Sequence, residues 1–264
     1  MDMTWYNGDF LSLILLAVVQ GFAEWVPVSS SSQIEIVSHL IGYQSSLFLE
    51  VALHFGTLMA VFVYFGKEIM DILRDVFSGN WKSEEAKLGF AVIIAAIPAG
   101  IAGFFLKGFL ESNGGLGLVA CGLGITSMIL FIGSISPKKD EKFSYGKALL
   151  IGVAQILALF RGVSRSGSTI VTGLLLGLSE KNAVKFSFLL SIPIIFGANL
   201  LNLGNKTLPS SLFFASLVSF AVGISTIHFS FKYLLSDRKN LKWFAWFTLI
   251  EAIVIGGWVI FGKQ

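Results

Sequence analysis

The sequence predicts an all-α polytopic membrane protein with six transmembrane helices and two re-entrant helix pairs. Of its 264 residues, 55% are hydrophobic and only 13% are charged, and the mean hydropathy is +0.79. Soluble domains are usually about 45–50% apolar and about one-quarter charged. The excess is concentrated in stretches of roughly 20 apolar residues, the length that a helix needs to cross about 30 Å of hydrocarbon. The short segments of alternating polarity that are typical of a membrane β-barrel are absent from the sequence.

Six stretches are long and apolar enough to span the membrane, namely residues 46–66, 87–106, 115–135, 183–201, 211–232 and 243–261. Two further stretches, 10–28 and 146–160, begin as helices but run into clusters of proline, glycine, serine and arginine, which break helices. A short apolar stretch follows each cluster, at 34–42 and 169–178. Irregular backbone at membrane depth is tolerated only inside protein or beside a water-filled cavity. We therefore predict two re-entrant pairs, each entering and leaving on one side.

The basic residues predict the orientation of this layout. If the N-terminus lies outside, the outer side receives only Lys107, Lys206 and Lys263. The inner side receives Lys67, Arg74, Lys82, Lys87, Lys138, Lys139, Lys142, Lys147, Lys181, Lys185, Lys232, Arg238, Lys239 and Lys242. Such asymmetry is what the positive-inside rule requires. The first ten residues carry no lysine or arginine, so the basic region of a cleavable signal peptide is missing. We expect a multi-pass protein of the plasma membrane.

The layout also predicts an internal repeat within a single membrane domain, residues 1–264. Each half, about 1–136 and 137–264, has one re-entrant pair followed by three spans, so the halves have opposite topology. Gln20 precedes Ser29 by nine residues, and Gln155 precedes Ser164 by nine. Inverted repeats with interrupted helices place their binding site where the interruptions meet, near the membrane midplane. The stretches QGFAEWVPVSSSSQ (20–33) and FRGVSRSGST (160–169) should therefore face each other.

The second of these stretches has the composition of an anion site. An arginine at membrane depth costs at least about 2.5–3.5 kcal/mol on insertion scales, so Arg165 needs a partner or a hydrated cavity. Guanidinium groups and hydroxyls donate hydrogen bonds to phosphate oxygens, and helix N-termini attract anions. These features favour a phosphate cradle. The alternative is a structural ion pair between Arg165 and Glu24, with serines that cap helices.

The first stretch offers a carboxylate and four serines. Glu24 lies one helical turn after Gln20, on the same helix face. A carboxylate beside a diphosphate would be repelled unless a divalent cation, Mg²⁺ or Ca²⁺, lay between them. Without a cation, Glu24 would form a salt bridge to Arg161 or Arg165. The serines 29–32 are either phosphate donors or a nucleophile, and a nucleophilic serine needs an activating base. No histidine adjoins this run.

Five stretches together resemble the undecaprenyl-diphosphate phosphatase, or bacitracin-resistance, family of membrane proteins. They are QGFAEWVPVSSSSQ, EVALHFGTLMAVFVYF, AAIPAGIAG, QILALFRGVSRSGSTI and KFSFLLSIPIIFGA, and the resemblance covers essentially the whole chain. It implies the inverted-repeat fold with re-entrant helices. It also implies removal of the terminal phosphate from a polyprenyl diphosphate, which regenerates the monophosphate lipid carrier for cell-envelope biogenesis. Expected partners are this lipid, the surrounding membrane lipids and a second copy of the chain in a homodimer. Nucleic acid is not expected, because the basic residues are spread over short loops.

The resemblance also implies roles for individual residues. Glu24 and Gln20 fall on the positions that bind metal and take part in catalysis, and Ser30 falls on the proposed nucleophile. Arg165 falls on the arginine that binds phosphate. Ser164, Ser166 and Thr169 fall on its supporting hydroxyls. Two further phosphate contacts are expected from the residues themselves, the hydroxyl of Ser29 and the second cation, Arg161.

Three positions depart from the family pattern. The family usually has glutamate at Gln20, proline at Arg161 and, at Gln33, a histidine that is either the acid/base partner of the serine or itself the nucleophile. Glutamine cannot transfer a proton at neutral pH. The departures leave open an inactive enzyme, a carrier, or a variant mechanism in which Glu24 or a metal-bound hydroxide is the base. His54, one turn after Glu50, is either a supporting residue of the site or a packed histidine.

The sequence leaves three functions open, and the first two are favoured over the third. The first is the metal-dependent phosphatase, whose lipid substrate presents its head group to a cavity open to the outside. The alternative is a flippase or transporter for a polyprenyl phosphate, since inverted repeats commonly support alternating access. The third is a lipid-binding scaffold without catalysis, which the retained arginine, serines and glutamate disfavour.

Overall fold

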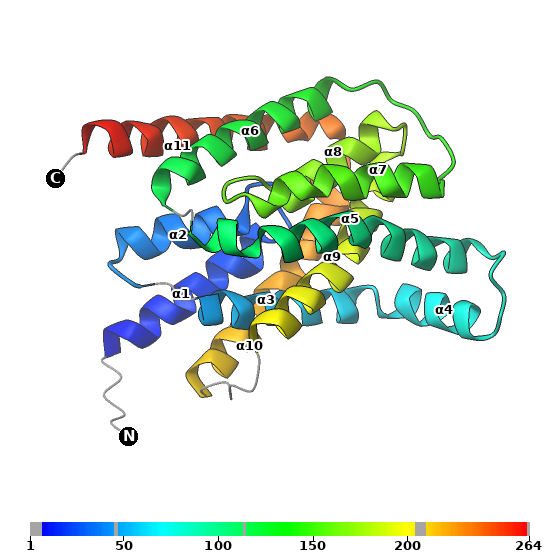
Figure 1. Cartoon of the computed structure of the whole chain (residues 1–264), viewed down its shortest axis with the longest axis horizontal. Helices are drawn as coiled ribbons and strands as arrows, with labels where there is room; N and C mark the ends of the chain where they lie inside the picture. Colours follow the sequence, from blue (N-terminus) through cyan, green and yellow to red (C-terminus); the bar gives the residue numbers. More distant parts are fainter. Residues whose placement is uncertain (1–6, 45–46, 113–114, 204–209, 263–264) are drawn as a thin grey trace.

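The computed structural model describes residues 7–44, 47–112, 115–203 and 210–262, and all regular structure in these ranges is helical (Figure 1). The longer helices are α1 (Asn7–Ala23), α2 (Ser30–Leu40), α3 (Leu47–Tyr64), α4 (Gly66–Phe77), α5 (Glu84–Ser112), α6 (Leu116–Ile135), α7 (Tyr145–Gln155), α8 (Arg165–Leu175), α9 (Glu180–Leu203), α10 (Ser210–Phe229) and α11 (Leu241–Phe261). Three short elements complete the fold, η1 (Ile156–Leu159), η2 (Ser230–Leu234) and η3 (Arg238–Asn240). The predicted all-α class is confirmed.

The six predicted spans each correspond to one long helix. Five helical segments of the described chain are long and apolar enough to cross a membrane: those of α5, α6, α9, α10 with η2, and α11. The sixth prediction, 46–66, falls on α3, which is bent by 76° from α4. The α3–α4 pair counts as a sixth span when it is taken as one broken segment. A multi-pass membrane protein is therefore confirmed, whereas the outside position of the N-terminus stays a prediction.

Both predicted helix interruptions are present. Helix α1 ends at Ala23 and α2 begins at Ser30, and we call residues 24–29 the first break. Helix α7 tightens into η1, and α8 begins at Arg165 after residues 160–164, the second break. A residue in each break has a positive φ, Ser29 at 65° and Gly162 at 94°. These backbone conformations turn the chain away from the helix before it. The apolar helices that precede the breaks, Phe10–Ala23 and Tyr145–Leu159, are shorter than the spans.

Helix packing relates the two predicted halves of the chain. Helix α1 packs on α10, and α7, the element in the same place in the second half, packs on α5. Helix α10 also packs on α3, just as α5 packs on α9, and α6 lies along α11 (Figure 1). If each helix is replaced by its counterpart in the other half, the contact of α1 with α10 becomes that of α7 with α5. The contact of α10 with α3 likewise becomes that of α5 with α9. This pattern supports a repeat, while the inverted relation of the halves stays a prediction.

Close glycine contacts hold these helix pairs together. A Cβ on Gly56 of α3 would lie 2.2 Å from the carbonyl oxygen of Ser216 on α10. A Cβ on Gly152 of α7 would lie 2.2 Å from the carbonyl oxygen of Ala95 on α5. Both distances are too short for any side chain, so glycine permits the backbones to touch. The tight packing of α7 against α5 fixes the wall that leads to the second break.

Candidate active site

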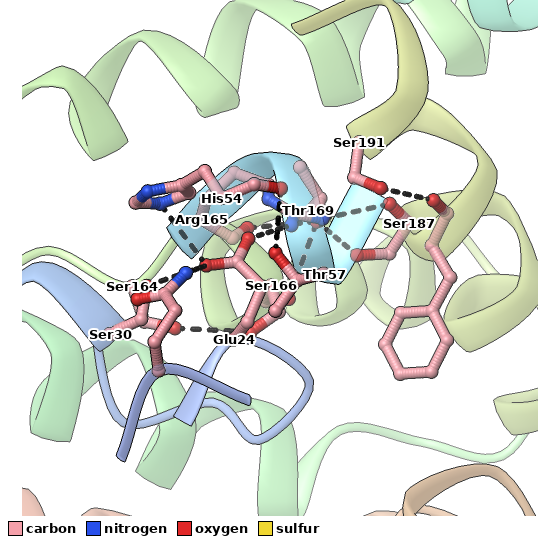
Figure 2. Close-up of polar contacts among 12 residues, drawn as sticks. Glu24, Ser30, His54, Thr57, Ser164, Arg165, Ser166, Thr169, Ser187 and Ser191 are labelled. Carbon is pink, nitrogen blue, oxygen red and sulfur yellow. Dashed lines mark hydrogen bonds and ion pairs between the residues drawn. The ribbon is translucent and has the colours of Figure 1, made fainter. Parts of the chain in front are cut away.

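The two breaks meet, as the sequence predicts. Arg165, at the start of α8, donates from Nη2 to Oε1 of Glu24 at 2.6 Å, although the residues are 141 positions apart (Figure 2). Nη1 of Arg165 donates to the backbone oxygen of Ser187 on α9 at 3.1 Å. The guanidinium also lies 5.8 Å from the ring of Trp25, which is fully buried in the first break. The ion pair proposed from the sequence as an alternative to phosphate binding is therefore present in this state of the protein.

Glu24 is the centre of the cluster, and its second carboxylate oxygen is also fully engaged. Oε2 accepts from Oγ of Ser30 at 2.6 Å and from Nε2 of Gln20 at 3.0 Å. Nε2 of His54, on α3, lies 3.4 Å from the same oxygen (Figure 2). The carboxylate itself is only 7% exposed. Glu24 therefore joins residues from α1, α2, α3 and α8, and His54 points at the site rather than into packing.

Both ring nitrogens of His54 face acceptors. Nδ1 lies 2.7 Å from the backbone oxygen of Glu50, one turn earlier in α3, and Nε2 faces Glu24. A neutral imidazole carries one N–H and can satisfy only one of two acceptors, whereas an imidazolium satisfies both. An imidazolium at His54 could therefore donate to both acceptors at once.

A strained residue aims Ser30 at Glu24. Ser29 is the only non-glycine residue of the described chain with a positive φ, 65°. Such a conformation costs about 1–3 kcal/mol, and it persists where the surrounding structure imposes it. The hydroxyl of Ser29 lies 3.0 Å from that of Ser32 and makes no capping bond to α2. The first turn of α2 therefore begins at Ser30 with its hydroxyl directed to the carboxylate.

The hydroxyls at the end of the second break and in the first turns of α8 bond mainly to backbone and to one another, and two of them also line the cavity. Ser164 caps α8, because its Oγ accepts from the backbone nitrogen of Gly167 at 3.1 Å. Ser166 lies 3.3 Å from Ser164 Oγ and donates to the backbone oxygen of Val26. Thr169 donates to the backbone oxygen of Arg165 at 2.9 Å and lies 2.7 Å from Oγ of Ser187. Ser164 and Ser166 line the cavity described below, whereas Thr169 does not.

Two predicted site residues have partners that the sequence did not indicate. Arg161 donates from Nη1 to Glu35 of α2 at 2.9 Å, and it lies 3.6 Å from a carboxylate oxygen of Glu50. Gln33 donates to Glu251 of α11 at 2.9 Å and does not line the cavity. The structure thus brings Arg161 to the site with its charge already paired. Gln33 lies outside the cavity lining and is the hydrogen-bond partner of Glu251, a pairing that the sequence did not indicate.

A cavity of 710 Å³ opens beside the cluster. Its polar wall includes Glu24, Ser29, Ser30, Arg161 and Arg165. The rest of the lining is largely apolar and comes from α5, α6, η1 and α9, including Ala96, Ala99, Gly100, Gly103, Phe104, Ile125, Leu159 and Ile194. The cavity therefore has both charged and apolar walls, which suits an amphiphile with an anionic head group.

Helix α6 holds the second break in place. Oγ1 of Thr126 donates to the backbone oxygen of Gly162 at 2.8 Å and accepts from the backbone nitrogen of Ser164 at 2.9 Å. Gly122, one turn earlier, lies so close that a Cβ there would be 2.2 Å from the backbone oxygen of Arg161. The sequence did not indicate this support, because a threonine and a glycine in an apolar helix carry no signal of their own.

Gly122→Ala should therefore destabilise the protein. The added methyl group must displace the backbone of the second break, and overpacking of this kind costs about 1–3 kcal/mol. Thermal unfolding in detergent measures the effect. Gly124→Ala is the matched control, because a Cβ at Gly124 meets nothing within 4 Å. Equal unfolding midpoints for the two variants would contradict the proposed contact.

The donor set near Glu24 can supply part of a cation site. The described residues contain no group of three or more His, Cys, Asp or Glu side chains that could hold a metal ion. However, Oε1 of Gln20 is buried without a hydrogen-bond partner, on the amide whose Nε2 donates to Glu24. Amide and carboxylate oxygens suit Mg²⁺ and Ca²⁺, which commonly complete their coordination with substrate phosphates and water. A cation at this place would be held by oxygens of Glu24 and Gln20 together with a phosphorylated ligand.

Comparison with known proteins gives consistent matches along the chain. A family model described as "Bacitracin resistance protein BacA" matches residues 13–254. A protein of Caldicellulosiruptor bescii named "Undecaprenyl-diphosphatase" is 39% identical over 253 residues, which cover 92% of this chain and 94% of that protein. "Undecaprenyl-diphosphatase 2" of Stutzerimonas stutzeri is 44% identical over 198 residues, covering 71% and 73%. An undecaprenyl-diphosphatase of Methanosphaera stadtmanae is 34% identical over 267 residues, covering 93% and 96%.

Proposed function

Because the chain belongs to the BacA family of bacitracin resistance proteins, we propose that it is an undecaprenyl-diphosphatase, which removes the terminal phosphate of a polyprenyl diphosphate. The relatives named for this activity support the substrate and the reaction. One structural observation carries the assignment of residues: Ser30 and Arg165 each hydrogen-bond to Glu24, through different carboxylate oxygens, at a cavity with charged and apolar walls. A phosphorylated lipid needs both kinds of wall.

In the proposed reaction, Ser30 is the nucleophile and Glu24 is its base. The 2.6 Å hydrogen bond aligns the hydroxyl proton with Oε2 of Glu24, so the carboxylate takes that proton as Oγ attacks the terminal phosphorus. The bond to the bridging oxygen breaks, and the lipid monophosphate leaves with the electron pair and with a proton from His54. Glu24 then passes the serine proton to His54, which restores both the carboxylate and the imidazolium. A water molecule then attacks the phosphoserine. Its proton passes to Glu24, the serine oxygen leaves and regains a proton, and inorganic phosphate is released.

His54 takes the place of the family histidine that is absent at Gln33. An imidazolium at His54 is aimed at Oε2 of Glu24 and is held by the Glu50 carbonyl. It therefore stabilises the carboxylate form of Glu24 and can supply a proton to the departing phosphate oxygen. Gln33, which bonds to Glu251, takes no part in proton transfer in this proposal.

Arg165 binds the terminal phosphate in the proposal. Its guanidinium is held on one side by the Ser187 carbonyl, and it exchanges part of its pairing with Glu24 for the phosphate oxygens. Ser29, Ser164 and Ser166 lie along the same wall and supply hydroxyl donors. Arg161 adds positive charge, reduced by its carboxylate partners. Thr169, bonded to the Arg165 carbonyl, positions the arginine rather than contacting phosphate.

We propose that the reaction depends on Mg²⁺ or Ca²⁺. A divalent cation held by oxygens of Glu24 and Gln20 together with the diphosphate would neutralise the charge that builds on the phosphate oxygens. The unpaired oxygen of Gln20 is the observation that supports this ligand set. We also propose a plasma-membrane location with the N-terminus outside, and a homodimer as the assembled form.

Phosphate release tests the function directly. The purified protein in detergent should release inorganic phosphate from farnesyl or undecaprenyl diphosphate in the presence of Mg²⁺ or Ca²⁺, and a chelator should stop the release. Release that persists with chelator would remove the cation from the proposal but leave the hydrolase. No release under any condition, together with movement of polyprenyl phosphate across vesicle membranes, would instead support the flippase alternative.

Ser30→Ala should lower kcat at least about 10²-fold, because the attacking oxygen is lost while the cavity keeps its shape. Ser31→Ala is the matched control. Ser31 also lines the cavity, but its hydroxyl lies 3.4 Å from that of Ser29 and makes no hydrogen bond to Glu24. Steady-state phosphate release measures both variants. Equal and mild losses would exclude Ser30 as the nucleophile.

A further inference from the structure

Gln155 is a buried amide with no hydrogen-bond partner. It is the last residue of α7, it is 2% exposed, and it lines the same 710 Å³ cavity as Glu24 and Arg165. Neither Nε2 nor Oε1 of its side chain has a partner in the structure. Burying an amide in this way carries a desolvation penalty that nothing in the fold offsets. An unpaired buried donor and acceptor at a cavity wall indicate a ligand.

The equivalent glutamine in the first half of the chain shows what Gln155 lacks. Gln20 lies nine residues before Ser29, and its Nε2 donates to Glu24, four residues further on. Gln155 lies nine residues before Ser164, but the residue four positions further on is Leu159 of η1, which is apolar. No carboxylate is therefore built into the second half to receive this amide, which leaves it available to the cavity.

The position of Gln155 indicates which part of a lipid diphosphate it meets. One turn before it, Gly152 touches the backbone of Ala95 on α5. Gln155 therefore lies beside the next turn of α5, where Ala96, Ala99 and Gly100 form part of the apolar lining. Arg165 begins α8, which also packs on α7, whereas Ser30 comes from the start of α2. The amide therefore lies on the helix that contacts both α5, with its apolar lining, and α8, with Arg165.

We propose that Gln155 binds the lipid-linked phosphate, the one that stays on the polyprenyl chain. This inference rests on the proposed phosphatase function. With the terminal phosphate at Ser30 and Arg165 and the tail along the small residues of α5, the first phosphate lies between them, against the amide. Nε2 donates to a phosphate oxygen, and Oε1 accepts from a bound water. A neutral amide suits a group that remains on the product, because a second arginine would hold the monophosphate too tightly to release it.

Gln155→Leu removes the amide and keeps nearly the same volume. We expect KM for farnesyl diphosphate to rise about tenfold, kcat to change less than about threefold, and the midpoint of thermal unfolding to stay equal or rise, since an unpaired polar group is removed. Gln155→Met should behave in the same way, because its flexible side chain fills irregular space. Thr226→Val is the matched control: Thr226 is a buried polar residue of α10 whose hydroxyl is bonded to Val222 and which does not line the cavity.

Product inhibition identifies the phosphate. In Gln155→Leu, inhibition by farnesyl monophosphate should weaken about tenfold, whereas inhibition by inorganic phosphate should be unchanged, because inorganic phosphate occupies only the terminal position. Unchanged KM and unchanged monophosphate inhibition would overturn the inference and leave the amide paired with ordered water. Equal weakening for both inhibitors would overturn it in favour of the terminal phosphate. If the unmodified protein releases no phosphate at all, that result contradicts the proposed phosphatase function itself, and not only the role of Gln155.

Discussion

Glu24→Gln is expected to lower kcat for phosphate release about 10³-fold, the middle of the range for loss of a general base. The amide keeps the size of the side chain but cannot take the proton of Ser30, which is bonded to Oε2 at 2.6 Å. It also leaves Arg165 and His54 without the negative charge that both face. Steady-state kinetics at saturating farnesyl diphosphate measure the loss.

Glu68→Gln is the control for this substitution. Glu68 lies on α4, pairs with Lys185 at 3.5 Å and does not line the cavity. Its replacement makes the same chemical change and should leave kcat unaltered. If Glu24→Gln folds, as judged by its thermal unfolding, and keeps more than about a tenth of the activity, Glu24 is not the base.

Arg165→Lys should lower kcat/KM about 10²-fold, and Arg165→Ala about 10³-fold. A lysine ammonium is a single point charge and lacks the planar fork that reaches Glu24 Oε1 and the Ser187 carbonyl at the same time. It therefore cannot keep its anchor on α9 while offering donors to a phosphate. Measurement of kcat/KM for farnesyl diphosphate in both variants gives the ratio.

Arg161→Ala provides the comparison for Arg165. Arg161 lines the same cavity, but its guanidinium is paired with Glu35 and lies near Glu50. Its charge therefore contributes less to a phosphate, and kcat/KM should fall less than about tenfold. An equal fall in kcat/KM for Arg161→Ala and Arg165→Ala would contradict the assignment of phosphate binding to Arg165 alone.

The positions of the helix breaks and of the cluster around Glu24 could be predicted from the sequence. Proline, glycine and serine clusters act on the local backbone, so the ends of α1 and η1 and the starts of α2 and α8 lie where those residues occur. The meeting of Glu24 with Arg165 followed from the predicted repeat. The exact partners did not follow, because a buried donor takes whichever acceptor the tertiary packing brings near.

Several contacts of the site could not be predicted for this reason. The pairing of Arg161 with Glu35, and of Gln33 with Glu251, joins α2 to the second break and to α11. Neither partner carries a pattern that points to the other. The bend of 76° between α3 and α4 was also missed, because residues 46–66 are apolar to their end and α4 continues the chain without proline.

The sequence by itself determined that this chain crosses a membrane with helices, and where those helices are interrupted. Hydrocarbon thickness sets the length of an apolar segment, and helix breakers act within a few residues, so both are readable locally. Only the tertiary structure decided that Ser30 and His54 share one oxygen of Glu24, and that Gln155 is left unpaired at the cavity wall. Those outcomes depend on how helices from distant parts of the chain pack. A hydrogen bond needs a donor and an acceptor about 3 Å apart in space, whatever their separation in the sequence.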